Sequence, residues 1–282
     1  MHNWIETLCI LHSELCIDRK KGVDPVKRVK VRVDTGCVCE QYVYSVPEKC
    51  DIRVARPKKP RFKSEAERKE HARKVAWRDH ARKVNENFFP GDLYATLTFD
   101  DEHEVHTFIE AKRLRDNYIR RLQRMEPECV VFAYLGRGKT TGRIHMHILA
   151  RGLSEEQLAK KWGMGSVIHV RPLREHNYYK VGDKKVDHGA DFTGLANYLI
   201  GHWTEEQGGH RYKCTRNARV PKPEKPKEVK RDYSEKHPPR APKGYQLVAC
   251  EGNQYGYWWF KYVRKPTPKP VGRPRKNAQL KS

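Results

Sequence analysis

The sequence is short of acidic residues and of paired cysteines. Its 58 Lys and Arg face only 35 Asp and Glu, which leaves a net charge of +23. So large a positive excess predicts a polyanionic partner. The eight cysteines include no Cys-x2-Cys pair, so the usual zinc-site spacing is absent and we expect mostly free thiols. One alternative stays open, a small metal knuckle built from Cys37, Cys39 and Cys50.

Long apolar runs are also missing. No stretch approaches the roughly 18 consecutive apolar residues of a membrane-spanning helix, and no basic helix has a strong apolar face for lying on a membrane surface. Nucleic acid is therefore the expected polyanion, with no membrane partner. The first residues, Met1 to Glu6, lack the basic start and apolar run of a signal peptide, so we expect a cytoplasmic protein in a reducing compartment.

The composition changes along the 282 residues, which fit one large domain or two modest ones. Short alternating strands come first, strand and helix patterns follow, and proline and lysine dominate later. An aromatic hairpin near the end is expected to pack on the main domain, with base stacking as the alternative. We expect a β-rich lead-in at 1–56, a basic helix at 57–90, a central domain at 91–220, a Pro/Lys-rich linker at 221–243, the aromatic hairpin at 244–263 and a mobile basic tail at 264–282.

The basic helix begins at a capping box, Ser64-x-x-Glu67. Between Lys58 and Lys83, eleven Lys or Arg face four acids. A charge run of this kind is often a solvated helix face, but this density favours contacts with phosphates. The residues expected to make those contacts are Lys69, Arg73, Lys74, Arg82 and Lys83.

The central segment alternates strand and helix patterns. β-Branched and aromatic runs indicate strands, and apolar residues at spacings of three and four indicate helices. In this order the elements predict an α+β fold, a mostly antiparallel β-sheet with helices packed on one face. We expect strands at 93–99, 128–135, 144–150 and 167–170, and helices at 108–125, 154–162 and 192–207.

Two histidines lie one residue apart on the third of these strands. Because side chains alternate along a strand, His145 and His147 share one face, while Ile144, Met146 and Ile148 face a core. Two imidazoles converging in this way favour a divalent metal site. The alternative is a half-buried strand whose polar face happens to hold two histidines.

A relaxed nucleotide-binding loop pattern, Ala133-x-x-x-x-Gly138-Lys139-Thr140, precedes the histidines. A phosphate-binding loop needs its lysine and threonine to begin a helix, so that backbone N–H groups point at the phosphates. Here a strand follows instead, so we reject an NTP site. We expect a hairpin tip whose Arg137 and Lys139, with the adjacent Arg143, contact the DNA backbone.

The last predicted helix offers a nucleophile. At 100° per residue, Tyr198, His202 and Glu205 share a face of this helix. A phenol near a cation loses its proton more easily and can attack phosphorus. Imidazole with carboxylate or water ligands suits Mn²⁺ or Mg²⁺. The alternative is that Tyr198 is an ordinary packing residue.

These motifs together resemble a known family. The series Thr96-Leu97-Thr98-Phe99, His145-Met146-His147 and Tyr198, with the turn Trp162-Gly163-Met164-Gly165, is similar to the HUH endonucleases, specifically the rolling-circle replication initiators (Rep proteins) of bacterial plasmids, phages and integrative elements. The resemblance runs from about residue 56 to 209, and more loosely through 255–263. It implies a five-stranded antiparallel sheet and a bacterial host. It also implies a divalent cation on His145 and His147, with Tyr198 as the nucleophile that nicks one strand and stays linked to its 5′ phosphate.

The chain departs from the family pattern at two places. Relatives often carry a third metal ligand about eight residues before the histidine pair, where this chain has Gly136 and Arg137. The third ligand is left open among Glu205, Asp100 and His202.

Relatives also tend to carry lysine three residues after the tyrosine, where this chain has Gly201. Tyr178, Tyr179 and Tyr212 therefore remain alternative nucleophiles. With a single candidate tyrosine on the helix, closure of the DNA strand would need a second subunit or water. An oligomer is therefore one possibility.

The expected function is replication initiation, in which a nick at a single-stranded or stem-loop origin frees a 3′ hydroxyl for a host polymerase. A host helicase is an implied partner, since no helicase segment is visible. In the tail, Arg273 and Arg275 lie in an AT-hook-like motif suited to A·T-rich minor grooves, or in a merely solubilising tail. The alternatives are a transposase or relaxase of a mobile element and a noncatalytic DNA-binding protein.

Overall fold

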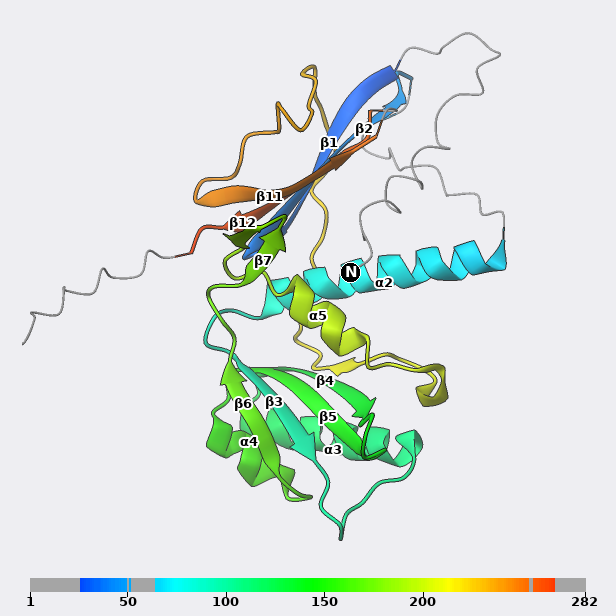
Figure 1. Ribbon diagram of the computed structural model, residues 1–282, viewed down its shortest axis with the longest axis vertical. Coiled ribbons are helices and arrows are strands. Elements are labelled where there is room, and N and C mark those ends of the chain that lie inside the picture. Colours follow the sequence, from blue (N-terminus) through cyan, green and yellow to red (C-terminus); the bar gives the residue numbers. More distant parts are fainter. Residues whose placement is uncertain (1–25, 50, 52–63, 254–255, 267–282) are drawn as a thin grey trace, which may run out of the picture.

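Two five-stranded antiparallel sheets organise the chain, which is seen here in a computed structural model that describes residues 26–49, 51, 64–253 and 256–266 (Figure 1). The central sheet has the strand order β6-β3-β5-β4-β9, and the outer sheet has the order β10-β1-β2-β12-β11. The central sheet consists of β3 (Leu93–Thr98), β4 (Val130–Arg137), β5 (Ile144–Arg151), β6 (Val167–Pro172) and β9 (Lys213–Cys214). The outer sheet consists of β1 (Val26–Thr35), β2 (Val38–Pro47), β10 (Lys227–Glu228), β11 (Tyr245–Gly252) and β12 (Trp258–Arg264). A separate hairpin consists of β7 (Tyr178–Val181) and β8 (Lys184–Asp187).

Helices cover both faces of the central sheet. On one face, Met146 and Ile148 pack with α3 (Phe108–Met125) and α4 (Glu155–Trp162). On the other, Phe132 and Leu149 pack with α2 (Glu65–Asn87) and α5 (Thr193–Ile200). The α+β class and the antiparallel sheet are confirmed, but the prediction of helices on one face is wrong. The unbroken burial along β4 is the reason, since a strand covered on both faces carries no polar side.

The helix starts follow their capping residues. Ser64 accepts a hydrogen bond from the Glu67 backbone and begins α2, and Ser154 forms a full capping box with Gln157 at the start of α4. The last helix is shorter than predicted, because α5 ends at Ile200. After Gly201 the backbone tightens: His202 and Trp203 donate to carbonyls three residues back, and a short 3₁₀ turn, η2 (Glu205–Gln207), follows.

The outer sheet joins strands from opposite parts of the chain. The β1–β2 hairpin fits the β-rich lead-in, and the predicted aromatic hairpin forms as β11 and β12. This hairpin does not simply pack on the main domain, because β12 pairs edge to edge with β2, with Trp259 opposite Tyr42. Residues 1–25 of the lead-in, Cys50 and the tail with Arg273 and Arg275 lie outside the described residues.

The segment at 221–243 is not a free linker. Within it β10 pairs with β1, while Tyr233 and Ala241 pack against the outer sheet. The Tyr262 hydroxyl donates to the Pro239 carbonyl at 2.5 Å. Proline-rich composition predicts a linker, but a few apolar anchors are enough to hold such a segment on a sheet.

Ion pairs fasten the outer sheet to the helices above the central sheet. Arg82 of α2 donates to Glu40 of β2, with 2.7 Å between Nε and Oε2. Lys261 of β12 lies 2.6 Å from a carboxylate oxygen of Asp191, just before α5. These contacts position α5 over the polar part of the central sheet. Among the described residues, no helix combines the length and apolar character that crossing a membrane requires.

Candidate metal centre and nucleophile

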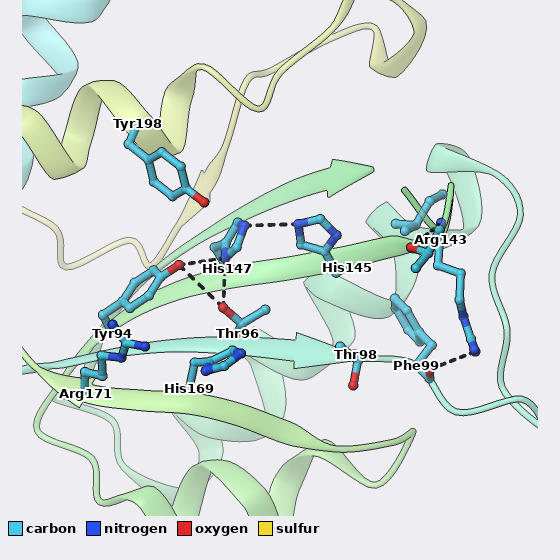
Figure 2. A pocket seen from close by; sticks show the side chains of 12 residues that line it. Tyr94, Thr96, Thr98, Phe99, Arg143, His145, His147, His169, Arg171 and Tyr198 are labelled. Atoms are coloured by element: carbon cyan, nitrogen blue, oxygen red, sulfur yellow. Dashed lines mark hydrogen bonds between the residues drawn. The ribbon is translucent and has the colours of Figure 1, made fainter. Parts of the chain in front are cut away.

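The two histidines of β5 share one face of the central sheet, as their spacing predicts. Their side chains point toward α5, and their Nε2 atoms lie 3.1 Å apart (Figure 2). The partner residues on β3 are Thr98 and Thr96, opposite His145 and His147 respectively. Ile144, Met146 and Ile148 are buried on the other face, so the strand carries both the site and the core.

A third imidazole completes the cluster. His202, in the turn after α5, offers a ring nitrogen that lies with those of His145 and His147 within 4.8 Å of one another. Of the three candidates for the third ligand, only His202 belongs to this cluster. Asp100 instead accepts hydrogen bonds from His103, at 2.9 Å from the backbone and 2.7 Å from the ring. Glu205 is exposed on η2.

A glycine makes room for these rings. Gly136 of β4 pairs with His145, and a Cβ at this position would lie 2.9 Å from His145 Nε2 and 3.0 Å from His202 Nδ1. Any larger residue would push the rings apart. Gly136 therefore leaves a space beside His145, and the ring of His202 from the turn after α5 lies next to it.

The three imidazoles are neutral at ordinary pH. Burial, helped by the neighbouring His145 and His202, lowers the pKa of His147 to about 3. Burial also lowers the pKa of His145 and of His202. Neutral imidazoles offer the lone pairs that a metal ion needs.

Neighbours on β3 fix the orientation of His147. Its Nδ1 lies 3.0 Å from the Tyr94 hydroxyl and 3.0 Å from the Thr96 hydroxyl. Such partners on one ring nitrogen leave the other, Nε2, to face the cluster. In addition, His202 Nε2 is buried without a hydrogen-bond partner among the described residues. The donor set thus fits a divalent cation.

The ring of Tyr198 lies beside this cluster. Its centroid is 6.0 Å from that of His147 and 4.7 Å from that of His202, and its hydroxyl points toward the histidines (Figure 2). The side chain is 55% exposed, so it is not an ordinary packing residue. The alternative tyrosines lie elsewhere: Tyr212 stacks on Phe132, and Tyr178 and Tyr179 are in the β7–β8 hairpin.

An open pocket of about 670 Å³ contains His145, His147 and Tyr198. Its floor is the polar side of β3, and Arg143 lies at one end and Arg171 of β6 at the other. The last residue of α4 supports the floor, because Trp162 Nε1 donates to the Thr98 carbonyl at 3.0 Å. The pocket is lined by Tyr94, Thr96, Thr98, Phe99, Thr141, Arg143, Ile144, His145, His147, His169, Arg171 and Tyr198.

The rejected nucleotide-binding pattern lies in a hairpin turn between β4 and β5, as predicted. Lys139 is exposed in this turn. Arg137 pairs with Glu206 at 2.9 Å, and Arg143 reaches the pocket. Contacts of these three residues with DNA stay predictions.

The basic helix has two kinds of cation. Lys69 is exposed, and Arg73 and Lys74 both pair with Glu70 at the helix surface.

Two further cations of this helix turn inward. Arg82 is bonded to Glu40, and Lys83 lies 3.3 Å from Cys214 Sγ and over the ring of Phe132. Both side chains thus have internal partners that hold the helix to the sheets, and contacts of these two residues with DNA stay predictions.

Several residues of the site were not singled out from the sequence. Tyr94 could have been found, since it alternates with core residues in phase with Thr96 and Thr98 on one strand. Gly136, His169 and Arg171 carry no such local signal, because their roles depend on which strands become neighbours. No family model, curated protein or solved structure matches this chain, so the comparisons assign it to no family.

Proposed function

We propose that the protein is a metal-dependent DNA strand transferase in which Tyr198 attacks a phosphodiester of single-stranded or stem-loop DNA. The observation that carries the proposal is the position of an exposed phenol beside three neutral imidazoles in one open pocket. The net charge of +23 supplies affinity for the polyanionic substrate.

The residues divide the work as follows. His145, His147 and His202 would hold a divalent cation, which when bound withdraws charge from the scissile phosphate. Three imidazoles favour a first-row ion such as Mn²⁺ over Mg²⁺, which prefers oxygen ligands. Tyr94 and Thr96 keep the ring of His147 in place.

The phenolic oxygen of Tyr198 forms a bond to phosphorus as the bond from phosphorus to the 3′ oxygen breaks. The phenol gives its proton to solvent, and the departing 3′ oxygen takes one up to become a hydroxyl. The product is a 5′-phosphotyrosine link that conserves the energy of the broken bond for later rejoining.

In a cell this chemistry fits the initiation of rolling-circle replication at an origin, with a host helicase and polymerase as partners. A transposase or relaxase would use the same reaction on another target. The competing function without catalysis is DNA binding alone, with structural histidines.

The test is incubation of the chain with labelled stem-loop oligonucleotides and Mn²⁺, followed by electrophoresis in SDS. We expect a covalent adduct that Tyr198→Phe and chelation of the metal both abolish, while Tyr178→Phe, outside the pocket, retains it. The double variant His145→Ala, His147→Ala should lose cleavage and keep most DNA affinity, since phosphate contacts supply it. An adduct in Tyr198→Phe would refute the nucleophile, and absence of metal-dependent cleavage on every stem-loop would favour the noncatalytic protein.

A further inference from the structure

The two ends of the pocket differ in how their arginines are occupied. At one end Arg143 lies 2.8 Å from Asp101 and 3.5 Å from Glu104, so acids already balance its charge. At the other end Arg171 of β6 is exposed, and within the described part of the chain its guanidinium forms no hydrogen bond or ion pair. An unbalanced guanidinium at the wall of a pocket is suited to an anionic oxygen.

Beside Arg171 the backbone is irregular. The register of β6 against β3 shifts between Tyr94 and Thr96, which places an extra residue in β6. His169 lies in this bulge with φ of 54°, and among the described residues it is the sole non-glycine with positive φ. Its ring lines the pocket on the side opposite α5 (Figure 2). Strained conformations of this kind persist where a side chain has to be aimed at a particular place.

The location of β6 at the sheet edge allows a single DNA strand to extend out of the pocket on this side. β6 is at the edge of the central sheet, and none of the strands that the structure describes pairs with its outer side. An imidazole ring offers a stacking face to an unpaired base, which a duplex keeps inside its own stack. The cation and the ring therefore fit one nucleotide unit of a single strand, phosphate and base together.

We propose that Arg171 and His169 form a binding subsite for single-stranded DNA next to the scissile phosphate. Arg171 binds a neighbouring phosphodiester, and His169 contacts the adjacent unpaired base. The inference rests on the proposed function and names the substrate class at the same pocket.

The test measures binding without cleavage, in the Tyr198→Phe chain, by fluorescence anisotropy of a labelled single-stranded oligonucleotide over a range of salt concentrations. Each lost phosphate contact reduces the slope of log affinity against log salt by about 0.7 for a single strand. We expect this reduction in Arg171→Gln and recovery in Arg171→Lys. The matched control is Arg174→Gln, an exposed arginine three residues on and outside the pocket, which should keep the full slope.

His169→Gly separates the ring from the backbone, because glycine adopts positive φ without strain. We expect weaker binding of the single strand and unchanged binding of a duplex of the same sequence. An unchanged slope in Arg171→Gln, or equal losses for single strand and duplex, would overturn the subsite. If the wild-type chain nicks DNA but Arg171→Gln leaves the salt slope unchanged, only the subsite is refuted. If Arg171→Gln reduces the slope but the wild-type chain never nicks DNA, only the proposed chemistry is refuted.

Discussion

Buried polar side chains at the two sheets have different kinds of partner. In the outer sheet, Glu40 is bonded to Arg82, and Lys261 is bonded to Asp191. On the central sheet, the rings of His145 and His147 converge with that of His202 from the turn after α5, and no carboxylate of the described residues belongs to this cluster. Both sheets have five antiparallel strands, so the difference lies in the partners of their polar side chains.

The contrast distinguishes polar groups that stabilise the fold from polar groups that are available to bind a ligand. A buried charge is costly unless it is paired, so these two ion pairs each supply the counter-charge that a buried group of the outer sheet needs. A neutral imidazole costs less free energy to bury than a charged group, and it keeps a lone pair that can bind a metal ion. Substitutions at the ion pairs of the outer sheet should therefore lower the free energy of unfolding, whereas substitutions around the histidines should lower the affinity for a metal ion.

The largest effect is expected at the buried pair of the outer sheet. Asp191→Asn leaves the ammonium of Lys261 buried without its counter-charge, so we expect a loss of about 3–5 kcal/mol in the free energy of unfolding. Denaturant unfolding measures it. The double variant Asp191→Asn, Lys261→Met should lose less than the sum of the single variants. Additive losses would show that the pair is not coupled.

A smaller effect, in a different assay, is expected beneath the histidines. Gly136→Ala places a methyl group against His145 Nε2 and His202 Nδ1, so affinity for Mn²⁺ should fall on the order of 10-fold or more. Titration calorimetry with the metal measures it. Gly138→Ala, whose methyl group would meet Thr141 and the Arg143 carbonyl but none of the three histidines, is the control and should bind Mn²⁺ normally. Equal affinity in both variants would mean that the rings tolerate displacement and that Gly136 is no determinant of the site.

The smallest effect is the pH dependence that Asp191 contributes. Burial acts to raise the pKa of Asp191, but Lys261 and Thr193 outweigh it and the pKa is lowered. The stabilisation is therefore complete above the unfolded value of about 3.9 and is lost as pH falls further. The wild-type chain should lose stability below about pH 4 more steeply than Asp191→Asn, by up to about 1.4 kcal/mol per pH unit. Parallel curves in acid urea titrations would contradict this.

Local sequence patterns predicted much of this architecture. Alternation along β5 identified both the core face and the histidine face, and the apolar stripe of α3 matched its bounds of Phe108–Met125. Capping serines marked the starts of α2 and α4. These features depend on residues at most a few positions apart.

Features that depend on distant neighbours were not predictable. The choice of His202 over Glu205 depended on where α5 ends, and a continuous helix would have kept both on one face. The pairing of β2 with β12 joins residues more than 200 positions apart, for which the sequence pattern offers no register. The role of Gly136 depends on rings from two other elements.

The place of β12 within the outer sheet affects how the chain is made. All strands of the central sheet are synthesised by Cys214, whereas β2 acquires its second neighbour only when Trp258–Arg264 emerges. Until then one edge of β2 presents unpaired N–H and C=O groups, the kind of edge on which chains associate wrongly. A nascent chain would therefore form the sheet that carries the histidine cluster first and remain vulnerable to aggregation until β12 is synthesised.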